Sequence, residues 1–566
     1  MSERTMTKVT KMKQLLSALV AWTALLMTAP AHAAAPGITG ANKNPTFNLT
    51  AQSAFLNQPD GNSVYSWGYG CNSSSPPTGF APTMPNQNCP TMQVPGPTLI
   101  VNEGDNVTVN LTNNLPASAG NTSILFPGFN VTTGCGATTP TGVQGLLTCE
   151  AAPGNTVTYT FTASSPGTRA YYSGTQGDLQ IDMGLYGAII VLPANVPTAC
   201  NSGVHASNMT AQSTSSQAHP GVMETDFRLA HAAYDHPGAC YDREYLFQFA
   251  EMDLNIHNLA LAQVTACTAA GTPNCKLDVP TEPYHPSYFV VNGRSMPDDM
   301  DPNFDAVYPH QPYNGNPHMH PGELTLIRVI GQGRWQHPFH EHANHVRILA
   351  RDGNLIKSAS DTWDSAAGTG TPALAGPLLF TTTTTPGQAF DGIFYFTGRG
   401  LNWDMYGHNP SSADANAKLP CTPDANGYNT GAPTAINYFE WCQDHNKPLQ
   451  AHPFGDVPAG GPATLPDPNI FTNGAWYSGT PYLGPDASLR ATNAACANAP
   501  ATGNNAGACT PLQPANIQAN PANERGWAFM WHSHNEREIT TNNVFPGGMF
   551  MMMLVDSREF VIDESQ

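Results

Sequence analysis

The chain has 566 residues, enough for two or three domains with sizeable cores. Charged residues make up only 11% of it, against roughly 25% in an average soluble protein, while glycine and proline number 51 each. This composition favours many short strands joined by turns, because glycine and proline interrupt helices. The net charge of −19 argues against nucleic acid or an anionic membrane as a partner.

The N-terminal 33 residues have the pattern of a secretory signal peptide. Lys8, Lys11 and Lys13 precede an apolar run, LLSALVAWTALLM, and the A-x-A cleavage pattern APAHA follows. A membrane span needs about 20 apolar residues, and this run is shorter. We therefore expect cleavage after Ala33, a secreted or periplasmic protein, and no membrane span.

The cysteines also indicate an oxidising compartment. There are twelve, and they fall into near neighbours along the chain, which suggests six disulfides that staple loops. Cysteine spacing alone leaves the connectivity open. The expected pairs are Cys71/Cys89, Cys135/Cys149, Cys200/Cys240, Cys267/Cys275, Cys421/Cys442 and Cys496/Cys509.

Strand patterns dominate the sequence. Apolar and polar residues alternate in 104–113, GDNVTVNLTN, and in 151–163, which is the period of a half-buried strand. The apolar run 183–193 predicts a buried strand, and no long segment has a convincing helical period. An all-β fold is therefore expected.

The strand patterns occur twice along the chain, which indicates an internal repeat. GDNVTVNLTN has a counterpart in GELTLIRVIG at 322–331, and APGNTVTYTF at 152–161 has one in TPGQAFDGIFYF at 385–396. The repeat predicts two similar all-β domains, the second with a long loop-rich insertion. The expected boundaries are 1–33 for the signal peptide, 34–200 for the first domain, 201–240 for a linker, 241–566 for the second domain and about 402–524 for the insertion.

Two histidine pairs mark the second domain. His340 and His342 stand in HPFHEH, and His532 and His534 stand in WHSHNE. Residues i and i+2 of a strand share a face, so each pair points to one side, and four imidazoles converge if the two strands are neighbours. Imidazoles suit copper or zinc better than magnesium or calcium. The alternative is a set of hydrogen-bonded structural histidines.

The first domain has no histidine at the corresponding positions, which suggests that only the second domain carries chemistry. Aligning the repeats gives the pairs Leu125/His340, Pro127/His342, Tyr172/His532, Ser173/Ser533 and Gly174/His534.

These motifs resemble those of the multicopper oxidase family, which includes laccases. HPFHEH is similar to the family's HPxHLH motif, and WHSHNEREITTNNVFPGGMFM is similar to its HCHxxxHxxxxGM motif. GPTLIVNEGD and the segment from SPGT to GLYGAIIV resemble the family's first domain. The resemblance implies two cupredoxin-like Greek-key β-sandwich or barrel domains, bound copper, and oxidation of a small-molecule or metal-ion reductant.

The chain departs from the family at the electron-entry copper, known as type 1. The resemblance places Ser533 at its cysteine, His337 at its first histidine and Glu538 at its second. Because serine supplies no thiolate, we expect this copper to be absent. His337 stays a candidate metal residue, with a structural role as the alternative.

The trinuclear copper cluster is also incomplete, because two of the family's four HxH motifs are missing. The resemblance leaves His340, His342, His532 and His534 as ligands, so we expect fewer than four coppers per chain. A homo-oligomer cannot restore the missing ligands, because every copy lacks them. The sequence therefore predicts a copper-dependent oxidoreductase with a reduced site and no assignable catalytic residue. The alternatives are a non-catalytic copper-binding protein or one subunit of a hetero-complex.

Each of two further groups of polar residues near the motifs has two possible roles. Glu341, Glu536 and Glu538 either accept bonds from ligand imidazoles or are solvated loop carboxylates. His318 and His320 form a third HxH pair, which either supplies missing ligands or lies exposed before its strand.

Overall fold

The computed structural model describes most of the chain between Ala34 and Asp556. The described residues are 34–135, 142–213, 224–271, 275–399, 420–433, 435, 437–445, 476–477, 526–556 and 562. The expected signal peptide, the pair Cys496/Cys509 and most of the 402–524 insertion lie outside them. Within the described ranges, no helix is long and apolar enough to cross a membrane.

Residues 37–192, called the first unit here, form two five-stranded sheets. Buried and more exposed residues alternate along their strands as the sequence predicts, and apolar side chains of both sheets share one core. One sheet has the order β3 (Ser63–Cys71), β2 (Thr46–Asn57), β6 (Asn106–Asn113), β10 (Thr156–Thr162) and β7 (Thr132–Thr133). The other has the order β11 (Gly167–Tyr172), β12 (Tyr186–Leu192), β5 (Leu99–Asn102), β1 (Gly37–Thr39) and β4 (Gly79–Ala81).

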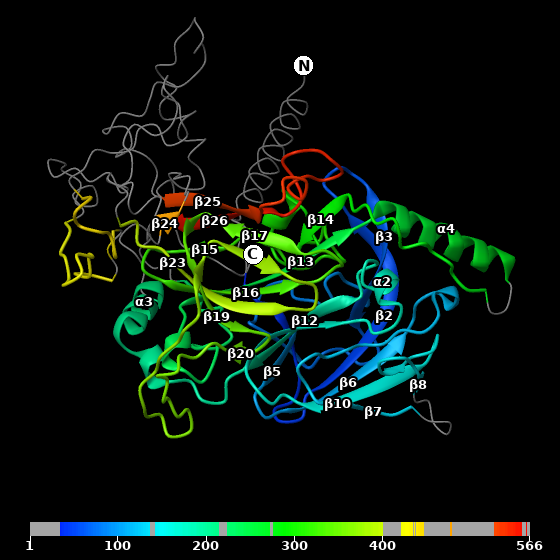
Figure 1. Cartoon of the computed structure of the whole chain (residues 1–566), viewed down its shortest axis with the longest axis horizontal. Coiled ribbons are helices and arrows are strands. Elements are labelled where there is room, and N and C mark those ends of the chain that lie inside the picture. Colours follow the sequence, from blue (N-terminus) through cyan, green and yellow to red (C-terminus); the bar gives the residue numbers. More distant parts are fainter. Residues whose placement is uncertain are drawn as a thin grey trace, which may run out of the picture.

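Residues 243–556, called the second unit, repeat this arrangement (Figure 1). Phenylalanine, methionine and tryptophan side chains fill the core between its two sheets. One sheet has the order β14 (Tyr288–Val291), β13 (Arg243–Met252), β16 (Leu324–Gly331), β23 (Ala389–Tyr395), β19 (Val346–Arg351) and β20 (Asn354–Leu355), with β21 (Leu378–Leu379) also on β19. The other has the order β15 (His318–Met319), β26 (Phe550–Asp556), β25 (Gly526–Ser533), β17 (His337–Glu341) and β22 (Thr381–Thr384).

The strand pairing of the two units confirms the repeat. β2 pairs parallel with β6 and β6 antiparallel with β10, as β13 does with β16 and β16 with β23. Leu125 forms a bridge with Tyr172, and His340 pairs with His532. The two bridges occupy the positions that the repeat alignment equates. The all-β, two-sandwich fold is therefore confirmed, while the domain boundaries stay predictions.

Helix α4 (Leu254–Ala270) contradicts the expectation that no long segment is helical. Asp253 caps its first turn, and Gly271 ends it in a left-handed conformation. Ile256, Ala260 and Val264 are among its few buried residues, so its apolar stripe is narrow and gives a weak periodic pattern. The helix contacts β3, and thereby joins the second unit to the first (Figure 1).

Five of the six expected disulfides are present, and the sixth lies outside the described residues. They join Cys71 to Cys89, Cys135 to Cys149, Cys200 to Cys240, Cys267 to Cys275 and Cys421 to Cys442. Small paired elements complete the described fold: β8 (Val143–Gln144) with β9 (Cys149–Glu150), and β18 (Ala343–Asn344) with β24 (Trp476–Tyr477).

Candidate metal centre

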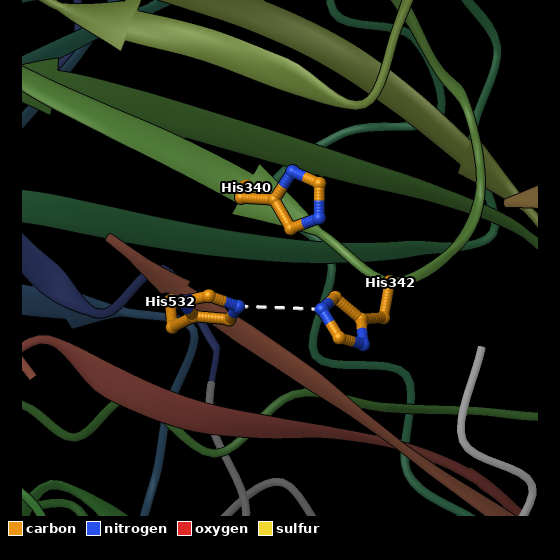
Figure 2. A group of neighbouring side chains, drawn as sticks. All are labelled: His340, His342 and His532. Carbon is orange, nitrogen blue, oxygen red and sulfur yellow. Dashed lines mark hydrogen bonds between the residues drawn. The ribbon is translucent and has the colours of Figure 1, made fainter. Parts of the chain in front are cut away.

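The two histidine pairs meet where β17 and β25 run side by side. One ring nitrogen from each of His340, His342 and His532 lies within 4.8 Å of those of the other two. Figure 2 shows His342 and His532 pointing toward one another, with His340 beside them. The His534 ring centre lies 4.7 Å from that of His340 and 5.7 Å from that of His532, on the exposed side of the group. The structure thus brings together the four residues of the two pairs.

Hydrogen bonds orient two of these rings through their Nδ1 atoms. Nδ1 of His532 lies 2.7 Å from the carbonyl oxygen of Ser533, and Nδ1 of His340 lies 2.6 Å from the hydroxyl of Thr381. A carbonyl only accepts, so the proton of His532 belongs on Nδ1 and the lone pair on Nε2. That Nε2 lies 3.2 Å from Nε2 of His342, which needs a proton or a cation between the two nitrogens.

The environment keeps these imidazoles neutral. Burial lowers the pKa of His340 to about 4, helped by repulsion from His532 and His534. Burial lowers the pKa of His342 to about 3, with repulsion from neighbouring imidazoles acting in the same direction. Burial also lowers the pKa of His532. Neutral imidazole is the form that binds a metal ion, so the donor set fits copper or zinc.

His337 lies in a different environment from the other four predicted residues. It is fully buried, with Nδ1 2.9 Å from Oε2 of Glu538 and Nε2 2.9 Å from Oε2 of Glu251. Burial acts to lower its pKa, but the bonds to the two carboxylates prevail and raise it to about 9. Both ring nitrogens of His337 are thus engaged by carboxylates in this structure.

Ser533 and Glu538 complete this buried group. The Ser533 hydroxyl donates to Oε2 of Glu538, and Asn535 donates to Oε1 at 2.8 Å. Glu538 is only 1% exposed, so it is neither a solvated loop carboxylate nor a partner of the clustered imidazoles. Its bond goes to His337 instead.

Glu251 was not singled out from the sequence. Its Oε1 accepts bonds from the backbone N–H groups of Arg334 and Trp335, both at 2.7 Å, and from the Tyr284 hydroxyl at 3.1 Å. The sequence carries one indication: Glu251 stands in REYLFQFAEM, a stretch rich in apolar and aromatic residues, and in the structure all ten residues of this strand are buried. A buried carboxylate requires hydrogen-bond partners or a positive charge.

The remaining two glutamates lie in opposite environments. Glu536 is exposed. Glu341 is fully buried, and its carboxylate has no hydrogen-bond partner among the described residues. Burial raises its pKa well above the usual range of a carboxyl group.

The third HxH pair is buried rather than exposed, and it lies away from the cluster. Nδ1 of His318 lies 2.7 Å from a carboxylate oxygen of Asp556, and Nε2 of His320 lies 2.6 Å from one of Glu224. His318 is opposite Leu554 on β26, while His532 is opposite Phe550. Four residues of a strand span about 13 Å, too far for a shared ion.

The first unit fills the corresponding place with an aliphatic side chain. A β-carbon added to Gly174 would lie 2.8 Å from Cγ of Leu125, so the leucine covers this glycine. Together with the register of the Leu125–Tyr172 bridge, this contact supports the predicted asymmetry between the units.

Comparisons with known proteins cover part of the chain. Residues 88–196 match the family model described as multicopper oxidase. Laccase-2 of Botryotinia fuckeliana is 39% identical over 98 residues, which are 17% of this chain and 16% of the relative. An L-ascorbate oxidase of Brassica rapa subsp. pekinensis is 37% identical over 99 residues, 18% and 16% of the two chains. The matched segment is thus about a sixth of the length of these relatives.

Solved structures show a similar range of proteins. A blue copper oxidase from Nitrosomonas europaea aligns over 90% of this chain and 85% of its own, with 13% identity and a TM-score of 0.39. A structure titled multicopper oxidase mgLAC aligns over 62% of this chain and 75% of its own, with 18% identity and a TM-score of 0.36.

Proposed function

Because the chain belongs to the multicopper oxidase family, we propose that it binds copper through His340, His342, His532 and His534 and acts as a copper-dependent oxidoreductase. The observation that carries the proposal is the close approach of ring nitrogens from two neighbouring strands. Copper accepts imidazole nitrogen readily, and its oxidation states allow it to take an electron from a bound reductant.

The chain's own residues prepare this site in three ways. Thr381 and the Ser533 carbonyl hold the Nδ1 atoms of His340 and His532, which orients both rings. Partial burial lowers the pKa of His340 and His342 and keeps these two imidazoles unprotonated near neutral pH. The exposed His534 leaves one side of the group open to a small-molecule or metal-ion reductant.

A type 1 copper is not part of the proposal. Ser533 offers a hydroxyl where a thiolate is needed, and both nitrogens of His337 are bonded to carboxylates. The first unit offers Leu125 and Gly174 where histidines are needed, so we expect fewer than four coppers per chain. Five disulfides support a secreted or periplasmic location.

A second candidate is a copper-binding protein without catalysis, or a subunit whose different partner supplies further ligands. The covered position at Leu125 and Gly174 favours this candidate, because the chain itself adds no imidazole there. Oxygen uptake separates the two: uptake with phenolic or metal-ion reductants supports the oxidoreductase, and copper binding without uptake supports the alternative.

The deciding experiment is metal analysis of purified protein loaded with copper and then freed of excess ion. We expect at least one bound equivalent in the wild type and in the control His285→Ala, whose ring is exposed elsewhere. We expect His340→Ala to lose it. Equal copper in wild type and His340→Ala would contradict the site, and the intense colour of thiolate-bound copper would contradict the absence of type 1 copper.

A further inference from the structure

His337 belongs to a buried group that joins three parts of the second unit. Glu251 lies on β13, His337 on β17, and Glu538 in the loop after β25. The imidazole connects the two carboxylates at 2.9 Å on each side, and Ser533 of β25 donates to the same oxygen of Glu538. Called the ionic clamp below, this group comprises Glu251, His337, Ser533 and Glu538.

The first unit carries a neutral version of the same device. The Leu125–Tyr172 bridge matches the His340–His532 bridge, so Thr122 corresponds to His337 and Ser173 to Ser533. The hydroxyls of Thr122 and Ser173 both donate to Oε1 of Gln180, at 2.9 and 2.7 Å. Gln180, the last residue of the short helix α2 (Gly177–Gln180) after β11, thus accepts two bonds as Glu538 does in the second unit.

The ionic clamp lies directly behind the candidate ligands. Ser533 stands between His532 and His534, so its side chain points to the opposite face of β25. His337 stands three residues before His340 on β17. The clamp therefore ties together the two strands that carry the histidine pairs, from the side away from the metal.

At this position the second unit has His337 and Glu538 where the first unit has a hydroxyl and an amide, and both units have a serine. Hydrogen bonds that involve ionised groups are shorter and roughly twice as strong as neutral ones. The charged clamp also reaches β13, because Glu251 is fixed by Tyr284 and by the backbone of Arg334 and Trp335. The neutral device supports no cluster of imidazoles.

We propose that His337 is a positioning residue, whose bonds to Glu538 and Glu251 fix β17 against β25 and thereby align His340 with His532 and His534 for a metal ion. This inference rests on the proposed copper site. It assigns the clamp no contact with the metal and no part in electron transfer.

The test compares copper(II) affinity, measured by competition with a chelator, with the electron paramagnetic resonance spectrum of the bound ion. We expect His337→Gln to weaken binding roughly tenfold and to change the spectrum, as losses behind metal ligands do. Glu538→Gln keeps the shape of the acceptor side chain and gives it the amide group that Gln180 has in the first unit, and it should weaken binding in the same direction. This variant decides the matter if His337→Gln fails to fold.

Thr122→Val is the matched control, because it removes a bond from the neutral device in the first unit. It should lower the melting temperature of the copper-free protein without changing copper affinity or spectrum. A merely structural role for His337 predicts the same outcome for His337→Gln or Glu538→Gln, and that outcome overturns the inference. Failure of the wild type to bind copper would instead overturn the proposed function.

The double variant His337→Thr with Glu538→Gln copies the neutral device into the second unit. We expect it to recover melting temperature relative to His337→Gln, but to leave copper affinity low. Recovery of wild-type copper affinity would show that the neutral device is enough to align the histidines, and it would contradict the role given to His337.

Discussion

The two units place different chemistry on the same backbone. Leu125 meets Tyr172 in the first unit at the register where His340 meets His532 in the second. One bridge is lined by leucine, tyrosine and glycine, and the other by imidazoles. The comparison teaches that the sheet fixes where side chains meet, while the side chains alone decide whether a metal can bind there.

The difference extends to the layer behind these bridges. In the first unit the side chain of Gln180 accepts hydrogen bonds from two hydroxyls. In the second unit the side chain of Glu538 accepts them from an imidazole and a hydroxyl. The ionic clamp thus lies behind the imidazole cluster, and the neutral device lies behind the position filled by Leu125.

Copying the first unit into the second should have the largest effect. The double variant His340→Leu with His534→Gly reproduces the Leu125–Gly174 contact. Removing two imidazoles should weaken copper binding by more than the roughly 10–100-fold typical of losses behind a ligand. The chelator competition assay measures the loss, and circular dichroism checks the fold. Retained affinity would show that the four histidines are not the ligands.

The ionic clamp should lose its contribution to stability at alkaline pH, whereas the neutral device should not. The pKa of His337 is raised from 6.5 to about 9, so the folded protein holds this proton more tightly than the unfolded chain. The contribution of this proton to the free energy of unfolding is on the order of 3 kcal/mol. It is fully present below about pH 6.5, falls as the pH rises and is lost above about pH 9. Urea unfolding of the copper-free protein between pH 6 and 10 measures this loss of unfolding free energy.

The control for the alkaline loss is the double variant His337→Thr with Glu538→Gln, which removes the imidazole that loses its proton in this pH range. Its free energy of unfolding should decline less than that of the wild type over the same pH range. Parallel declines would assign the loss to other residues.

The sequence predicted the parts of the site that follow from strand geometry. Alternation fixes which side of a strand a residue occupies, so His340 and His342, or His532 and His534, share a face without further information. The internal repeat then supplied the register, and the observed bridges follow it. Both inferences depend only on local pattern and backbone pairing.

The clamp could not be predicted in this way. Glu251 lies 86 positions before His337, on another sheet, and nothing in its local sequence selects that partner. The family resemblance placed His337 among the candidate metal residues, and the structure shows both of its ring nitrogens bonded to carboxylates. Helix α4 was missed for a different reason: few of its residues are buried, so its position depends on Asp253, Gly271 and contact with β3.

Strand β22 adds a contact to the imidazole of His340. Thr381 of β22 pairs opposite His340 and holds its Nδ1. Thr381→Val keeps the shape but removes the hydroxyl, so copper affinity should fall by up to roughly tenfold. Thr381→Ser, which keeps the hydroxyl, should stay close to wild type in the same competition assay. Equal affinity of the valine and serine variants would show that this bond does not orient the ring.

The smallest expected effect concerns the join between the units. The Asp253 side chain caps α4 by accepting from the N–H of Asn255 at 2.9 Å, and it accepts from the N–H of His285 at 2.7 Å. Asp253→Ala removes both bonds and should lower the free energy of unfolding by about 1 kcal/mol. Asp253→Asn keeps an oxygen acceptor and should lose less in the same urea titration. Because the helix packs on the first unit and the candidate ligands lie in the second, copper affinity should be unchanged in both variants. A loss of affinity in Asp253→Ala would mean that the two units are coupled through α4, and that the metal site depends on more than the strands that carry it.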